Sequence, residues 1–188
     1  MANSDTMITP MARISFPELA KPKSFENQEP KYRCVLIFDK AAQADPRFKA
    51  LKAAVSAVAK EHWGDSIPKN LRNPFRPGSD KDGMDGFDDD VIFISVTSKT
   101  RPGVVNALKE PIVDVEEEVY PGCHVFASVR AYSYDQKGNR GVAFGLNNIL
   151  KVKDGERLGG GKRSAQEDFG EIEIEGAADA AEDADIFG

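Results

Sequence analysis

Histidine and cysteine are scarce in this chain, which limits the chemistry it could carry. The 188 residues include two histidines and two cysteines, so candidates for acid–base catalysis or zinc ligation are few. Cys34 and Cys123 each lie in an apolar, strand-like run, a setting typical of small buried thiols rather than of a disulfide. We therefore expect no catalytic residues, no cofactor and no metal site.

Long hydrophobic runs are also missing. No apolar stretch approaches the roughly 20 residues that cross a bilayer, and the N-terminal segment MANSDTMITPMARISF lacks the basic and apolar regions of a signal peptide. These features predict a cytoplasmic protein with no membrane partner.

Cations are absent from the end of the chain. Residues 165–188 contain nine acidic residues and no Lys or Arg, whereas residues 1–164 contain 22 acidic and 25 basic residues. A mildly basic body with an acidic tail is typical of a polyanion binder that carries its own competitor. The alternative, equally open at this point, is that the tail only aids solubility.

The pattern of apolar residues predicts a mainly β protein. Strands are expected at 12–19, 31–38 and 91–98, with shorter extended pieces at 104–108 and 111–117. One helix is expected after Asp45 as N-cap and Pro46 as first residue, ending at Gly64. Residues 65–90 are broken by Pro and Gly and should form a long loop.

The last part of the folded chain predicts a long hairpin. Its first strand covers 123–134, the turn lies around Gly138-Asn139, and the return strand covers 140–146. The return strand extends to 152 if it continues past an interruption of the strand pattern at Asn147-Asn148. We expect an OB-fold-like five-stranded barrel with one α-helix between early strands, long loops and a flexible acidic C-terminal tail. The domains are then residues 1–158 and, as a Gly-rich linker and tail, 159–188.

The strand that ends near residue 134 is the most informative segment. Its inward positions are small and mostly apolar, whereas the other face presents Phe126, Ser128, Arg130, Tyr132 and Tyr134. Tyrosines beside a cation are what binding of single-stranded nucleic acid needs, because bases stack on aromatic rings while cations meet phosphates. The alternative is that these tyrosines pack beneath another loop or a partner subunit.

Further cations and one aromatic residue could extend this surface. Lys137 and Arg140 flank the hairpin turn, and Lys99 and Arg101 follow the apolar strand. The long loop interleaves Arg72, Phe75 and Arg76, again an aromatic residue with cations. Ordinary solvated charges explain the spacing of Lys99 and Arg101 equally well.

An acidic loop gives a competing hypothesis. Five aspartates, Asp82, Asp85, Asp88, Asp89 and Asp90, could serve a metal-dependent nuclease or recombination enzyme. Met84 stands where an EF-hand needs an oxygen ligand, and consecutive aspartates point in different directions. We therefore interpret the segment as a solvated loop.

Three motifs resemble those of a known family. They are RPGVV, the pattern Y-x-G-x7-R-x-Y from Tyr120 to Tyr132, and GNRGVAFGLNNI. Over roughly residues 10–160 the sequence resembles the single-stranded DNA-binding proteins of tailed phages. The resemblance implies an OB-fold, sequence-independent binding of single-stranded DNA, and a role in phage replication or recombination in the host cytoplasm. A homo-oligomer is left open, as is a phage structural or assembly protein whose tyrosine face is a subunit interface.

The resemblance also gives the acidic tail a role. Asp183, Asp185, Ile186 and Phe187 resemble the tip through which related proteins recruit replication or recombination partners. The acidic residues are expected to compete with DNA for the cationic surface. This chain departs from the usual pattern because Gly188 follows Phe187, so the phenylalanine does not carry the terminal carboxylate.

Overall fold

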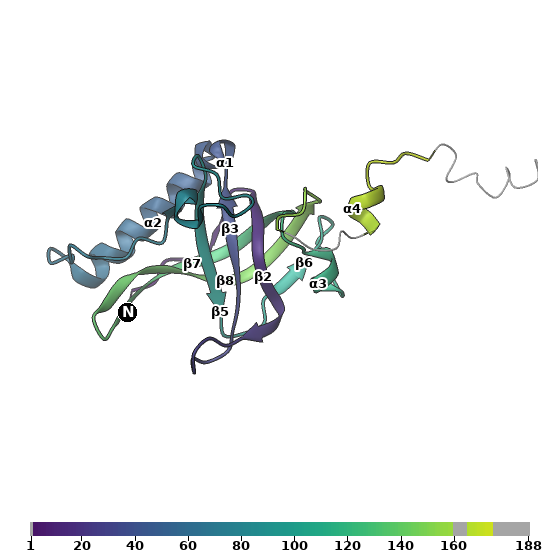
Figure 1. Ribbon diagram of the computed structural model, residues 1–188. Helices are drawn as coiled ribbons and strands as arrows, with labels where there is room; N and C mark the ends of the chain where they lie inside the picture. The colour runs from purple at the N-terminus through teal and green to yellow at the C-terminus, as the bar shows by residue number, and fades with distance from the viewer. Residues whose placement is uncertain (1, 160–164, 175–188) are drawn as a thin grey trace, which may run out of the picture.

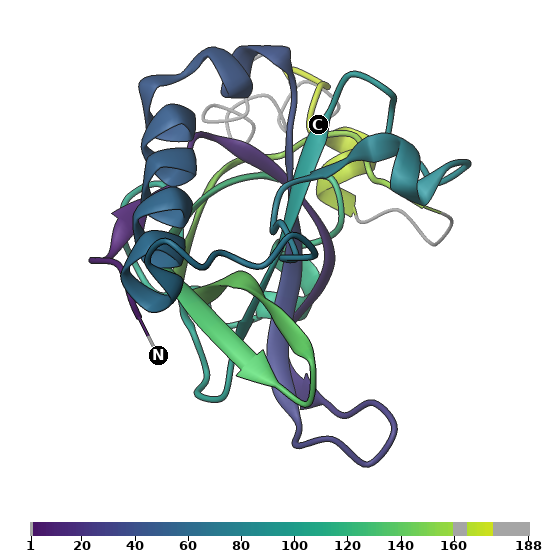
Figure 2. The same ribbon diagram turned by 90° about the vertical axis from the view of Figure 1, so that its left-hand side faces the viewer.

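Five strands pair into a closed ring in the computed structural model, which describes residues 2–159 and 165–174. They are β2 (Ala12–Lys23), β3 (Lys31–Phe38), β5 (Ile92–Ser98), β7 (His124–Gln136) and β8 (Asn139–Lys153). The ring runs β2–β3–β5–β8–β7 and returns to β2, with β5–β8 parallel and the other pairs antiparallel. Figures 1 and 2 show this ring from two sides. The prediction of an OB-fold-like five-stranded barrel is confirmed.

Three short strands extend the ring. They are β1 (Met7–Ile8) beside β7, β4 (Arg76–Pro77) beside β5, and β6 (Gly103–Val105) beside β8. β4 and a 3₁₀ turn at Gly78–Lys81 are the regular structure within the predicted long loop at 65–90.

The predicted helix forms where its capping residues indicate. α2 covers Pro46–Trp63; the Asp45 carboxylate accepts a hydrogen bond from the Arg47 amide at 2.8 Å, and Gly64 ends the helix with φ 57°. It lies between the second and third strands of the ring, as expected.

Three short helices were not predicted. α1 (Lys40–Ala44), α3 (Val115–Glu118) and α4 (Ala165–Phe169) add to α2. The prediction of an extended piece at 111–117 was wrong for residues 115–117, which belong to α3. There the Asp114 carboxylate accepts a hydrogen bond from the Glu117 amide and Val115 is buried, which stabilises a single helical turn.

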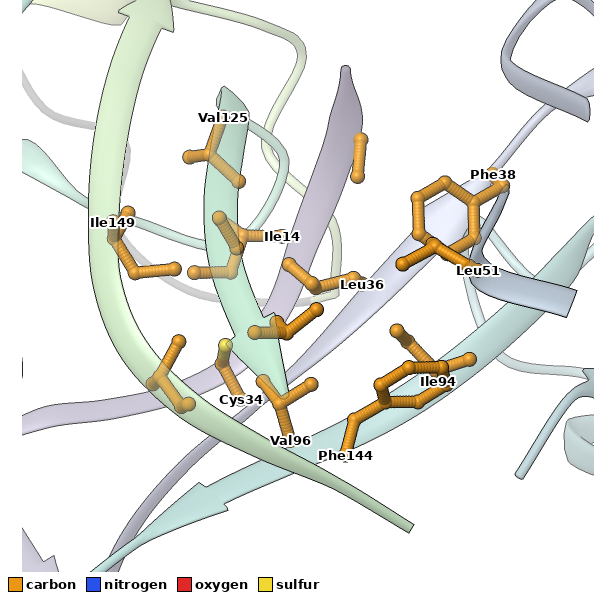
Figure 3. Packing of buried hydrophobic residues seen from close by; sticks show 14 of the residues in the cluster. Ile14, Cys34, Leu36, Phe38, Leu51, Ile94, Val96, Val125, Phe144 and Ile149 are labelled. Carbon is orange, nitrogen blue, oxygen red and sulfur yellow. The ribbon is translucent and has the colours of Figure 1, made fainter. Parts of the chain in front are cut away.

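The ring is filled from all its strands. Figure 3 shows Ile14, Leu36, Ile94, Val125 and Phe144 pointing into one interior. The predicted inward residues of β7 are all buried: Val125, Ala127, Val129, Ala131 and Ser133. α2 adds its own buried residues to this core. Cys34 and Cys123 are buried free thiols, as expected, and burial raises the pKa of Cys123 to about 12.

The β7–β8 hairpin has the longer of the two extents that its sequence allowed. β8 runs without interruption to Lys153, and the predicted break is a β-bulge, since Ser128 pairs with Asn148 while Val129 pairs with Leu146. The turn is Lys137-Gly138, one residue earlier than predicted. Both turn residues have positive φ, 50° and 83°, as a two-residue hairpin turn requires.

A second apolar cluster covers part of the outer surface of the ring. Leu158, Phe87 and Val91 pack on the outward side chains of β3 and β5, which include Ile37 and Phe93. Phe93 and its neighbour Ile94 are both fully buried although they face opposite ways, so this end of β5 is covered on both faces. Towards the other end of β5, Ser95 is exposed.

The segment after β8 is tied to the turn before β7. The Tyr120 hydroxyl donates to the Asp154 carboxylate at 3.1 Å, and the Leu158 amide donates to the Pro121 carbonyl at 2.9 Å. Among the described residues, no helix is both long and apolar enough to cross a membrane.

We predict that Gly122→Ala destabilises the protein more than Gly138→Ala. Both glycines have positive φ, so alanine is strained at either position, at a cost of about 1 kcal/mol. A Cβ at 122 would also collide with the Glu156 carbonyl, whereas nothing lies within 4 Å of one at 138. Urea unfolding should show a loss of about 3 kcal/mol for Gly122→Ala. Equal losses would contradict this account of the tie between the two segments.

Candidate nucleic-acid interface

The predicted tyrosines lie on the outside of the barrel and not in its core. Arg130 is exposed and Tyr132 and Tyr134 are half-buried, because they alternate with the buried residues of β7. Opposite them on β8 stand Gly145, Ala143 and Gly141. Two rings and a guanidinium therefore adjoin a strip of backbone with almost no side chains, which we call the tyrosine face.

Gly141 allows close packing at the end of this face. A Cβ at this position would come within 2.6 Å of the Tyr134 hydroxyl and 2.8 Å of the Arg72 Cβ. Gly145 is less tightly enclosed, since a Cβ there would lie 3.8 Å from the Tyr132 ring. The ring of Tyr134 thus lies directly against β8.

The long loop brings Arg72 to the same place. The Arg72 amide donates to the Arg140 carbonyl at 2.9 Å, and the Val142 amide donates to the Arg72 carbonyl at 3.3 Å. Residue 72 thus pairs with the free edge of β8 beside Gly141. The structure joins Arg72 to the tyrosine face, as the sequence hypothesis requires.

The side chains of Phe75 and Arg76 lie in different environments. The Phe75 ring packs edge-on against Phe48 and Phe144, with centroids 5.5 and 5.7 Å apart. Arg76 is exposed, pairs with Phe93 through β4, and its Nε lies 3.2 Å from the Asp80 carboxylate. The loop therefore contributes its cations to the surface and its aromatic ring to the core.

The remaining predicted cations lie at two ends of the barrel surface. Lys137 and Arg140 are exposed at the β7–β8 turn, with the Arg140 Nε 3.4 Å from the Asp135 carboxylate. Lys99 follows β5 and its Nζ lies 3.2 Å from the Glu29 carboxylate, next to the loop between β2 and β3. Arg101 is exposed after it.

Sequence reasoning missed an aromatic residue in that loop. Phe25 is 45% exposed, and the Arg33 guanidinium lies 4.2 Å from its ring centroid, with the Lys23 ammonium at 5.6 Å. We call residues 24–30 the Phe25 loop. The segment KPKSFENQEP places a phenylalanine among cations, the same signal that drew attention to residues 72–76.

One row of paired residues connects the two aromatic sites. Arg130 pairs with Gly145, Gly145 with Thr97, and Thr97 with Arg33, so the row crosses β7, β8, β5 and β3. In Figure 2 the tip of the β7–β8 hairpin and the Phe25 loop both lie in the lower part of the view. We call this row, with the tyrosine face and the Phe25 loop, the binding face.

The competing acidic loop does not gather its carboxylates. Within residues 2–159 and 165–174, no three His, Cys, Asp or Glu side chains are placed to hold a metal ion. The Asp85 carboxylate instead accepts a hydrogen bond from the Gly159 amide at 3.2 Å. The tail residues Asp183, Asp185, Ile186 and Phe187 lie outside the described residues.

Comparison with known proteins identifies the family. Residues 5–183 match the family model described as the ssDNA-binding protein of Enterobacter phage Enc34. The chain belongs to this family. The family resemblance drawn from the RPGVV, Tyr120–Tyr132 and GNRGVAFGLNNI motifs is confirmed. Protein p50 of Acyrthosiphon pisum secondary endosymbiont phage 1 is 28% identical over 172 residues, which cover 86% of this chain and 91% of p50.

Solved structures agree with the assignment to the Enc34 family. The Enc34 single-stranded DNA-binding protein in complex with ssDNA superposes with a TM-score of 0.72 at 26% identity, covering 82% of this chain and 89% of that one. Gp2.5, a single-stranded DNA-binding protein of bacteriophage T7, has a TM-score of 0.60 at 14% identity, covering 93% and 98%. The likeness to gp2.5 concerns the fold alone.

We predict that Gly141→Ala displaces Tyr134 whereas Gly145→Ala leaves Tyr132 in place. A methyl group at position 141 would be too close to both the Tyr134 ring and the Arg72 Cβ, so the Tyr134 ring has to move. A methyl group at position 145 would be at ordinary contact distances from its neighbours. Ring-proton chemical shifts of the two tyrosines measure the effect. Unchanged Tyr134 shifts in Gly141→Ala would contradict the packing described here.

Proposed function

We propose that this chain binds single-stranded DNA on the binding face, without sequence preference and without catalysis. The observation that carries the proposal is the row from Arg130 through Gly145 and Thr97 to Arg33, which has aromatic rings at both ends. In OB-folds, oligonucleotides bind across the second and third strands, between the loop joining strands 1 and 2 and the loop joining strands 4 and 5. Here these are β3, β5, the Phe25 loop and the 137–138 turn.

The chemistry of the face favours unpaired over duplex DNA. Tyr132, Tyr134 and Phe25 present rings on which bases stack, and such rings accept any base. Stacking requires unpaired bases, which a duplex does not present. Arg130, Arg33 and Arg72 supply charge for phosphates, so affinity should fall with increasing salt.

The predicted cations would contact DNA at different parts of the binding face. Lys137, Arg140 and Arg72 surround the tyrosine face, and Lys99 and Arg101 lie towards the Phe25 loop. Arg76 extends the surface along β5. We leave Phe75 out of the contact set because its ring is engaged in the core.

We further propose that the protein acts in phage DNA replication or recombination in the host cytoplasm. Residues 1–158 form the binding domain, since Leu158 is the last residue of the second apolar cluster, and 159–188 form the linker and tail. The nine acidic residues of the tail compete with DNA for the cations, and its tip recruits partner proteins. Charge opposition between the body and the tail supports this role.

We predict that loss of the stacking rings weakens DNA binding. The double variant Tyr132→Ala/Tyr134→Ala should lower affinity for oligo-dT at least about tenfold and Phe25→Ala about fivefold, given about 1–3 kcal/mol per stacked base. Fluorescence anisotropy at several salt concentrations measures both. Leu108→Ala, which removes an exposed apolar side chain in a loop outside both the binding face and the tail, is the control and should leave affinity unchanged.

Two results would contradict the proposal. Unchanged affinity in both aromatic variants would show that DNA binds elsewhere. Cleavage of labelled single strands with magnesium or manganese, lost on replacing Asp85 or Asp88, would instead support the nuclease hypothesis.

Removal of residues 165–188 should tighten DNA binding at low salt. The tail contains nine negative charges and no positive ones, so its loss frees the cations of the binding face, by about fivefold or more in affinity. The gain should shrink as salt screens the attraction. Weaker or unchanged binding of the shortened chain at low salt would argue that the tail is not a competitor.

A further inference from the structure

A pocket of about 590 Å³ lies between α2 and the loop that follows it. It adjoins the tyrosine face but opens on the other side of β8, because Val142 lines it and points away from the face of Gly141 and Ala143. The wall of the pocket is largely apolar and is formed mainly by α2 and the loop that follows it. The principal apolar residues are Val55, Ala59, Ile67, Leu71, Phe75 and Val142.

Positive charge surrounds this apolar wall. Lys52 and Lys60 contribute from α2, and Arg72 and Arg76 contribute from the loop, whereas none of the described residues that line the pocket carries a carboxylate. Arg76 is ion-paired to Asp80 at 3.2 Å. The pocket therefore suits a ligand with negative charges next to a bulky apolar group.

The end of this chain has that composition. Residues 183–187 read DADIF, two carboxylates followed by Ile186 and Phe187. The mainly aliphatic wall suits such side chains better than nucleobases, whose edges are polar. The chain between Gly159 and Ile186 spans up to about 90 Å when extended, well beyond the roughly 15 Å radius of gyration of a domain this size.

We propose that residues 183–187 seat in this pocket of their own chain, with Ile186 and Phe187 against the apolar wall and the acidic residues on the surrounding cations. This inference rests on the proposed function, because it specifies how the tail regulates DNA binding. Arg72 lines the pocket and also lies beside Tyr134. A tail carboxylate paired with Arg72 withdraws that cation from DNA without covering the tyrosines.

Photo-crosslinking in the full chain without DNA tests directly whether residues 183–187 bind in this pocket. The probe is p-benzoylphenylalanine in place of Phe187, and mass spectrometry locates the crosslinks. The proposal expects crosslinks within one chain to residues 46–77 or to Val142. Crosslinks to β3, to the Phe25 loop or to a second copy, or no crosslinks, would overturn it.

A pair of matched surface variants tests the consequence. Ile67 is 43% exposed in the pocket wall, and Leu108 is 77% exposed in a loop elsewhere, so both tolerate a polar side chain. In the full chain at low salt, Ile67→Asp should tighten oligo-dT binding about fivefold, within the usual range of coupling between sites. Leu108→Asp should not change it, and adding Phe187→Ala to Ile67→Asp should give no further gain because both remove the same contact.

The outcomes separate this inference from the proposed function. If Ile67→Asp has no effect while removal of residues 165–188 tightens binding, the tail acts elsewhere and only the pocket assignment is overturned. If the full chain does not bind oligo-dT, the proposed function fails. The crosslinking experiment contains no DNA, so it still decides whether the pocket holds the tail.

Discussion

The pairing of β8 with both β7 and β5 is the constraint on which the rest of the structure depends. β8 is antiparallel to β7 along its length and parallel to β5 at Val96–Phe144 and Thr97–Gly145. These contacts close the ring, and they also place Arg130, Gly145 and Thr97 in one row. Because side chains alternate between faces, a slip of one residue would exchange the tyrosine face with the core.

Much of this could be predicted because it depends on local periodicity. The alternation of small apolar with large residues along β7 predicts which side chains face outward, and burial of Val129, Ala131 and Ser133 confirms it. The helix α2 was equally predictable, since Asp45 and Gly64 act on the backbone within one turn of themselves.

The parts that sequence reasoning missed depend on contacts between distant segments. The sequence predicts Phe75 at the surface, but its ring packs against Phe48 and Phe144, which the closed barrel brings together. No role was predicted for Phe25, because the residues around it in sequence do not show where its loop lies relative to the β7–β8 turn. Those are consequences of topology and not of composition.

The same topology sets where the acidic segment begins. Leu158 packs on the outward side chains of β3 and β5, and the Gly159 amide bonds to Asp85. The chain thus leaves the barrel from one end of the surface whose other end carries Thr97 and Arg33. If the tail competes with DNA as we propose, its attachment at that point keeps it near the cations at high effective concentration. Under that proposal the effect depends on geometry as well as on charge, because the tie formed by Tyr120, Pro121 and Leu158 fixes the point from which the tail starts.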